Sequence, residues 1–195
     1  DISSEGLMAI YEALEVSPTG NVAVKLSTGE PGSNYLRTDL IGELVQSLEA
    51  TIVECNTAYG GSRANTAMHY QVAEDHGYTA IADVDIMEEE GSITLPVVVG
   101  DNLTENYVGS HFENYDYYVI LSHFKGHAMA GYGGAIKNIS IGIASSEGKA
   151  HIHSGGTGGS MWSGEQDAFL ESMAEAGKSV VDALDGNILY INVMN

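Results

Sequence analysis

The sequence predicts a single three-layer α/β domain over residues 1–195 with a mainly parallel sheet; a mixed sheet is the alternative. Short apolar segments of strand length alternate with amphipathic segments of helix length. Such alternation implies parallel strands joined by right-handed crossovers. The length fits one domain, and no linker rich in proline, serine or glycine divides the chain.

The first 84 residues are expected to form three successive helix–strand pairs. Leu7, Ile10 and Leu14 recur at helical spacing in the first pair, as do Leu40 and Leu44 in the second. The expected helices cover residues 4–15, 38–48 and 64–76, and the expected strands cover 22–26, 51–55 and 79–84. A polar loop that contains glycine follows the second strand, over residues 56–63.

The second half changes character. Residues 93–99 and 115–121 resemble buried strands with an irregular acidic link between them. A helix over 135–144, the longest helix over 164–184 and a final strand over 188–193 are expected next. The segment 154–160 (SGGTGGS) is expected to be a flexible loop. A helix cap stands directly at the first residues and a strand directly at the last, so we expect the encoded protein to be longer at both ends.

Composition excludes several function classes. The formal net charge of −20 argues against nucleic acid and anionic membranes as partners, because both need a basic surface. No apolar run approaches the roughly 18–20 residues that cross a bilayer, and no basic leader opens the chain, so a cytoplasmic location is expected. The single cysteine, Cys55, excludes an internal disulfide and an iron–sulfur cluster held by this chain's own thiolates.

The charge is distributed unevenly, and this locates the expected functional centre. Residues 123–153 contain Lys125, Lys137 and Lys149 against only Glu147, so this stretch is +2 while the remainder is −22. Four of the seven histidines also fall there. The stretch follows a predicted strand, and open α/β sheets bind ligands at the carboxyl ends of their strands.

The histidines suggest a metal. His123 and His127 are four residues apart, which places them on one side of a helix or a strand, whereas His151 and His153 share a side only in a strand. Imidazoles paired in this way suit a divalent transition metal such as Ni, Zn or Fe. We therefore expect His123, His151 and His153 to be metal ligands; the alternative is that they are packing and hydrogen-bonding residues.

The glycines and lysines suggest an anion. Gly133 and Gly134 precede a predicted helix, where backbone N–H groups favour a phosphate or carboxylate. The expected cofactor-binding residues are Lys125, Gly133, Gly134, Lys137, Asn138 and Lys149. Lys137 lies in the first helical turn against the dipole, which a bound anion would explain. The alternatives are glycines that only make tight turns and a lysine that is only a surface residue.

The motifs resemble those of a known family. Residues 123–142, Gly148-Lys149 with His151 and His153, and the opening Asp1-Ile-Ser-Ser-Glu-Gly-Leu together resemble the bacterial and archaeal family called domain of unknown function 362, whose members often carry the label iron–sulfur centre protein. Members often continue into cysteine-containing segments. The resemblance implies an iron–sulfur cluster only in parts outside this chain, and a ferredoxin-like module as a possible partner.

A more distant resemblance concerns the nickel-pincer lactate racemases, which have a stretch of the form His…Ala-Gly-Tyr-Ser-Gly-Gly-x-Lys and a later histidine. The matching positions are His127, Lys137 and His153, although residues 130–134 lack the serine. The resemblance implies that His127 is an acid/base catalyst, that Lys137 holds a cofactor covalently and that His153 binds nickel. His69 is a candidate for the second catalytic histidine of that family.

Together these patterns favour a metal- or cofactor-dependent enzyme, redox or isomerase-like, with its site in residues 123–153. His127 and Lys137 are the expected catalytic residues, and the ligand is a small molecule with a phosphate or carboxylate group. The alternative is a non-catalytic module that binds a metal or phosphate and serves an attached iron–sulfur domain.

Overall fold

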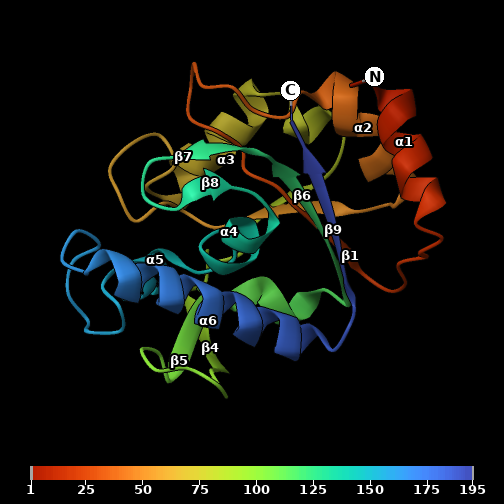
Figure 1. The fold of residues 1–195 in the computed structure, drawn as a ribbon. Coiled ribbons are helices and arrows are strands. Elements are labelled where there is room, and N and C mark those ends of the chain that lie inside the picture. Colours follow the sequence, from red (N-terminus) through yellow and green to blue (C-terminus); the bar gives the residue numbers. More distant parts are fainter. Residues whose placement is uncertain (1, 195) are drawn as a thin grey trace.

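A computed structural model describes residues 2–194 and confirms the α/β class (Figure 1). Its centre is a five-stranded, all-parallel sheet of order β3-β2-β1-β6-β9. The strands are β1 (Val22–Lys25), β2 (Thr51–Glu54), β3 (Val84–Ile86), β6 (Tyr117–His123) and β9 (Ile188–Val193). The side chains of β1 are buried on both faces, as expected when helices cover both sides of a parallel sheet.

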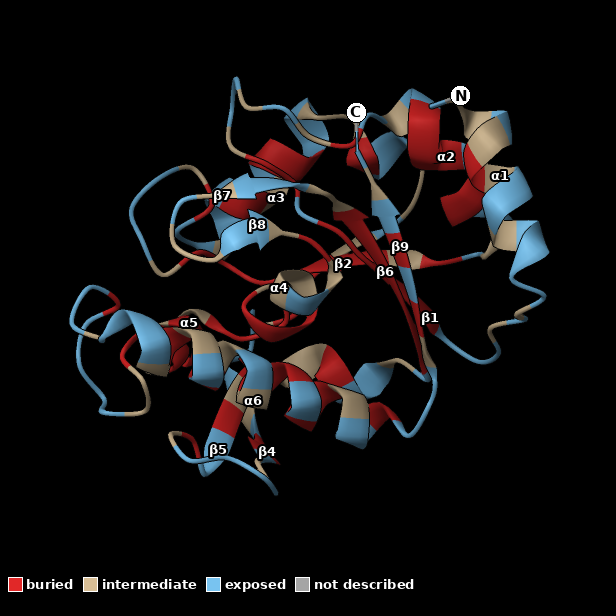
Figure 2. Cartoon of the chain, viewed as in Figure 1, coloured by how far each residue is buried: buried red, intermediate tan, exposed pale blue. Residues whose placement is uncertain are grey.

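Helices form a layer on each face of the sheet. The helices α1 (Ser4–Ala13), α2 (Thr38–Ser47) and α3 (Thr66–Asp75) lie on one face, and α4 (Ala135–Ser140), α5 (Ser146–His153) and α6 (Gln166–Leu184) lie on the other. Their inner sides and the central strands are buried, while the outer sides are exposed (Figure 2). None of these helices, among residues 2–194, is long and apolar enough to cross a membrane.

The order in which successive strands are added to the sheet reverses at β1. The chain moves from β1 outward through β2 to β3, and then returns to place β6 on the other side of β1 and β9 beyond it. The carboxyl ends of β1 and β6 therefore lie side by side at the switch point of the sheet. Open α/β folds form their ligand crevice at this point, because the connections leave in opposite directions.

The strand expected at residues 79–84 is wrong in position. Tyr78–Ala80 is a 3-10 turn, and the strand is β3, five residues later. Gly77 adopts a left-handed φ of +81°, which ends α3 and redirects the chain. Tyr78 is then buried from the turn itself, where its hydroxyl donates a hydrogen bond to the Leu36 carbonyl at 2.8 Å.

Two small antiparallel sheets flank the central one. The strand expected over 93–99 is β4 (Ser92–Pro96), and it pairs with β5 (Glu105–Gly109), part of the segment that was expected to be irregular. A second hairpin, β7 (Lys125–His127) and β8 (Gly131–Gly133), follows β6 directly. The helix expected over 135–144 ends at Ser140. The segment 154–160 forms turns tied to the end of α5, with Gly156 N–H donating to the His151 carbonyl at 3.0 Å.

Candidate functional site

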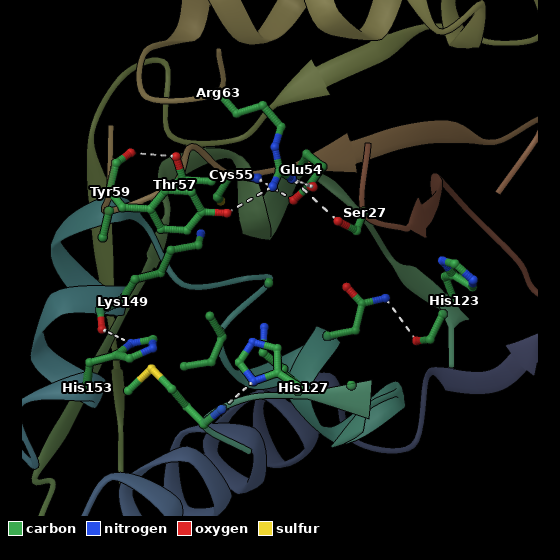
Figure 3. A pocket seen from close by; sticks show the side chains of 18 of the residues that line it. Ser27, Glu54, Cys55, Thr57, Tyr59, Arg63, His123, His127, Lys149 and His153 are labelled. Carbon is green, nitrogen blue, oxygen red and sulfur yellow. Dashed lines mark hydrogen bonds and ion pairs between the residues drawn. The ribbon is translucent and has the colours of Figure 1, made fainter. Parts of the chain in front are cut away.

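A cavity of about 410 Å³ lies at the carboxyl ends of β1, β2 and β6 (Figure 3). The β7–β8 hairpin, α4 and α5 line it on the other side. The polar and charged side chains that line it include Lys25, Ser27, Glu54, Thr57, Arg63, Ser122, His123, Lys125, His127, Lys137, Asn138, Lys149 and His153. The volume falls within the range of small-molecule sites in proteins.

Most of the few cationic side chains of the protein line the cavity. Five of the seven lysine and arginine residues line it. Of the 27 acidic residues, Glu54 alone lines it within the described part of the chain. Most of the positive charge of a protein with net charge −20 therefore surrounds one cavity, where a bound anion would offset the repulsion among the cationic side chains.

The floor of the cavity is a buried ion pair. The Lys25 ammonium lies 3.0 Å from Glu54 Oε2 and 2.9 Å from Asn138 Oδ1, and the Lys25 side chain is 1% exposed. Burial raises the pKa of Glu54, but the charge of Lys25 and the cations around it outweigh burial and lower this pKa to about 2. Asn138 also donates to Ser122 Oγ at 3.0 Å, which ties α4 to β6 across the floor.

Arg63 extends the floor from the loop after β2. Its Nη1 lies 3.4 Å from Glu54 Oε1 and its Nε lies 2.9 Å from Glu30 Oε1. Its Nη2 donates to the Tyr59 hydroxyl at 3.2 Å. The guanidinium is therefore fixed in orientation, and Glu54 pairs with Lys25 while it shares Arg63 with Glu30.

Two lysines that line the cavity have little negative charge nearby to balance their own. The Lys137 ammonium has no hydrogen-bond or ion-pair partner within residues 2–194. Burial lowers its pKa to about 8, and the charges of Lys149 and Lys25 act in the same direction. Burial also lowers the pKa of Lys149, whose ammonium donates to the Ala144 carbonyl at 2.5 Å. Both ammonium groups would gain from an anion in the cavity.

His127 is held in one tautomer by the turn of the β7–β8 hairpin. Its Nδ1 accepts hydrogen bonds from the backbone N–H groups of Met129 at 3.2 Å and Ala130 at 3.1 Å. A neutral ring with an accepting Nδ1 carries its proton on Nε2. Burial and the charge of Lys137 lower the His127 pKa, so the ring is neutral at pH 7 and acts as a hydrogen-bond donor through Nε2.

In His153 the donor and acceptor roles of the two ring nitrogens are reversed relative to His127. Its Nδ1 donates to the Lys149 carbonyl at 2.8 Å, one turn earlier in α5, and its ring stacks on Phe169 with centroids 4.5 Å apart. The neutral ring therefore presents the lone pair of Nε2. Burial lowers the His153 pKa, which keeps that lone pair available at neutral pH. This is the orientation that a metal ligand or a general base requires.

The structure brings together all of the predicted site residues except His151. His123, Lys125, His127, Gly133, Gly134, Lys137, Asn138, Lys149 and His153 line the cavity. His151 does not, because residues 146–153 form a helix rather than a strand. The expectation that His151 and His153 share a side is therefore wrong, and His151 packs instead against Tyr107, with ring centroids 5.1 Å apart. The catalytic and binding roles of the lining residues stay predictions.

The predicted metal ligands do not form one site. Among residues 2–194, no group of three or more His, Cys, Asp or Glu side chains is placed to hold a metal ion. Of His123, His151 and His153, the first and last line the cavity and the middle one lies outside it. The described residues therefore do not fit a metal site made by the protein alone, although His153 Nε2 can supply one ligand to a metal that a bound molecule also coordinates.

The two glycines before α4 serve different purposes. A Cβ at Gly134 would lie 2.9 Å from the Phe124 ring and 3.1 Å from Asn192 Oδ1, so packing requires glycine there. A Cβ at Gly133 would meet its nearest atom at 3.8 Å. The helix has only six residues, so Lys137 lies in its last turn as well as its first, and the expected conflict with a helix dipole does not arise.

Lys25, Glu54 and Arg63 line the cavity from outside the stretch 123–153 in which the site was expected. A lysine inside the short apolar strand Val22–Lys25 was the available signal, since such strands are buried. His69, the candidate second catalytic histidine, is fully buried and does not line the cavity. Its Nε2 lies 2.8 Å from Thr28 Oγ1.

The fold and the cavity define a three-layer α/β protein with a cation-lined, ligand-sized pocket at the switch point of a parallel sheet. The chain belongs to the family described as domain of unknown function (DUF362), whose model matches residues 22–195. Comparison with curated protein sequences gives no match.

Solved structures share the fold. The lactate racemase apoprotein from Thermoanaerobacterium thermosaccharolyticum aligns with a TM-score of 0.59 and 16% identity, over 100% of this chain and 49% of that one. A protein from Thermotoga maritima aligns with a TM-score of 0.54 and 16% identity, over 98% of this chain and 50% of that one. The chain thus spans about half the length of these proteins. The two resemblances drawn from the sequence are confirmed, the first as family membership and the second as a shared fold.

Proposed function

We propose that this domain is a cofactor-dependent enzyme, isomerase-like or redox, that binds a small molecule with a phosphate or carboxylate group in the cavity. One observation carries the proposal: five of the seven basic side chains surround the cavity with one carboxylate, in a chain of net charge −20. Repulsion among Lys25, Lys137 and Lys149 costs stability unless an anion is bound, so a selected function is the simplest reason to retain it.

The two histidines supply complementary chemistry for a proton transfer. His127 offers an N–H at Nε2, and His153 offers a lone pair at Nε2. In the proposed reaction His153 accepts a proton from the substrate, and His127 donates a hydrogen bond to the oxygen on which negative charge develops. Lys137, with no partner of its own, holds the anionic group. The hydrogen bonds thus favour His153, rather than His127, as the proton acceptor.

In this proposal, a metal would bind only where a bound molecule supplies most of its ligands. Nickel, zinc or iron would bring Lewis acidity or redox chemistry, and His153 Nε2 would then serve as one ligand instead of accepting a proton. The remaining ligands would have to come from the cofactor, because the described residues do not supply them. The fold shared with a lactate racemase apoprotein supports an isomerase-like reaction without defining the substrate.

A non-catalytic binding module is the alternative. Such a module needs the cations but has no use for neutral histidines beside the ligand. The orientation of His127 and His153 toward opposite hydrogen-bonding roles therefore favours the enzyme.

Histidine titration by NMR tests the proposal without knowledge of the substrate. Burial and nearby lysines lower the pKa of both His127 and His153 below the ordinary 6.5. Bound inorganic pyrophosphate should raise both values, because negative charge favours the imidazolium form. The Lys137→Met variant should bind pyrophosphate more weakly by about 1.5–3 kcal/mol, the contribution of a charge-assisted hydrogen bond.

Two controls separate a site effect from a general salt effect. Lys178→Met removes an exposed lysine that pairs with Asp182 on α6, and it should leave pyrophosphate binding unchanged. The NMR signals of the His151 ring, which lies outside the cavity, should not move when pyrophosphate is added. If His151 responds as strongly as His127 and His153, or if Lys178→Met weakens binding as much as Lys137→Met, the proposed site is wrong.

A further inference from the structure

The only tryptophan of the chain stands at the rim of the cavity. Trp162 lines the cavity, yet its side chain is 71% exposed. Tryptophan side chains are usually buried over most of their surface, because water solvates the indole ring poorly. An exposed indole at the mouth of a ligand-sized cavity offers a flat apolar surface that a ligand can cover.

The loop that carries Trp162 is fixed at several points. Met161, the preceding residue, is buried with 8% exposure and lines the same cavity. A Cβ at Gly164 would lie 2.1 Å from the His153 carbonyl oxygen, so the loop packs directly against the end of α5. Gln166 then donates to the Met129 carbonyl at 2.6 Å, which ties the loop to the β7–β8 hairpin. These contacts hold Trp162 beside the site.

The rim and the floor of the cavity differ in character. Tyr59 lines the cavity from the loop after β2 with 42% of its surface exposed, and its hydroxyl is held by Arg63 at 3.2 Å. The apolar side chains of the lining are Ala58, Ala128, Met129, Ile141 and Met161. The lining therefore combines cations with aromatic and apolar surface, and a ligand that fits it carries an anionic group on an apolar, ring-shaped body.

We propose that Trp162 is a specificity-determining residue that stacks on a flat, unsaturated ring of the ligand, while the lysines bind the ligand's anionic group. This inference rests on the proposed function, since it requires an anion in the cavity. Stacked rings gain from the matched faces of two π systems, which a puckered saturated ring of the same size does not provide.

Two ligands that differ only in the ring test the inference. Phenyl phosphate and cyclohexyl phosphate have the same charge and a six-membered ring, so calorimetric titration of both isolates ring flatness. The native protein should bind phenyl phosphate roughly two- to tenfold more tightly. Trp162→Leu should lose this preference, whereas Trp162→Phe should keep most of it. Tyr190→Leu removes an exposed aromatic that does not line the cavity, and it should leave the preference intact.

The possible results distinguish the role of Trp162 from the existence of the anion site. Equal affinities in the native protein, or a preference that survives in Trp162→Leu, overturn the role of Trp162 and leave the anion site standing. If neither organic phosphate nor inorganic phosphate binds, the proposed function fails and this inference with it. A measurement on the native protein covers the case in which Trp162→Leu does not fold: nuclear Overhauser effects should connect the phenyl protons to the indole protons, and their absence overturns the inference.

Discussion

Replacing Glu54 by glutamine should destabilise the protein strongly, because Glu54 is the counterion of a buried group of cations. The Glu54 carboxylate lies 3.0 Å from the Lys25 ammonium and 3.4 Å from Arg63, and the side chains of Glu54 and Lys25 are nearly inaccessible to water. Glutamine preserves the shape but removes the charge, and its NH2 group cannot accept a hydrogen bond, whereas both Glu54 oxygens accept from backbone N–H groups, those of Thr28 and Cys55. Lys25 would then be buried without compensation, which typically costs 3–5 kcal/mol when one partner of a buried pair is lost.

A second estimate comes from the ionisation of Glu54. Its pKa of about 2 in the folded protein, against 4.5 for a free glutamate side chain, corresponds to about 3 kcal/mol of stability at neutral pH. Because the folded pKa is the lower one, this contribution is complete above pH 4.5. It is lost as the pH falls from about 4.5 through about 2. The two estimates agree, so the structure predicts a loss of about 3 kcal/mol.

Urea denaturation followed by circular dichroism measures this loss. Asp182→Asn is the matched control, because it removes one partner of the exposed Lys178–Asp182 pair on α6 and should change the free energy of unfolding by under about 0.5 kcal/mol. The Lys25→Met/Glu54→Gln double variant should lose less stability than its two single variants lose in sum, because each change removes the charge that the other leaves without a countercharge. A loss below about 1 kcal/mol for Glu54→Gln would refute the claim that this carboxylate anchors the floor.

The further predictions concern three residues: Cys55, Lys137 and Gly142. Burial raises the pKa of the Cys55 thiol to about 12, so it should resist labelling by a disulfide reagent at pH 8 until urea unfolds the protein; fast labelling of the folded protein would contradict its burial. Lys137, with a pKa of about 8 lowered by burial, should be acylated at pH 8 before the exposed Lys178, as mass spectrometry of the digest would show. Because the folded pKa lies below the ordinary 10.5, the stability of the native protein relative to Lys137→Met should rise between pH 8 and pH 10.5. Gly142→Ala should destabilise by about 1–3 kcal/mol, since its Cβ would lie 2.2 Å from a backbone carbonyl oxygen, whereas Gly126→Ala has open space and should cost little in thermal denaturation.

Much of the fold could be predicted because its central strands are buried on both faces. Such strands appear in a sequence as short continuous apolar runs, and the helices between them show one apolar face. The two small hairpins were harder to predict. Glu105–Gly109 contains polar residues and no apolar run that marks a strand, and its pairing with Ser92–Pro96 across the irregular connection 97–104 is not visible in its own sequence.

The site was predictable to the extent that rare residue types marked it. Lysines are few here, and the three between residues 123 and 153 all line one cavity. His151 was misplaced because its alternation with His153 suggested a strand, whereas Ser145 caps a helix by accepting from the Gly148 N–H at 3.1 Å. Lys25 was missed because its importance depends on Glu54, which comes from a neighbouring strand.

The most direct test of the anion site is a crystal structure of the protein grown with sodium selenate, whose selenium can be located by anomalous scattering. The account predicts a selenium peak inside the cavity, within hydrogen-bonding distance of the Lys137 ammonium and facing the side chains of His127 and His153. It also predicts that the peak is absent from crystals of Lys137→Met grown in the same way. Selenium peaks confined to the outer surface of the native protein, with none in the cavity, would contradict the central claim that this cluster of cations is an anion-binding site.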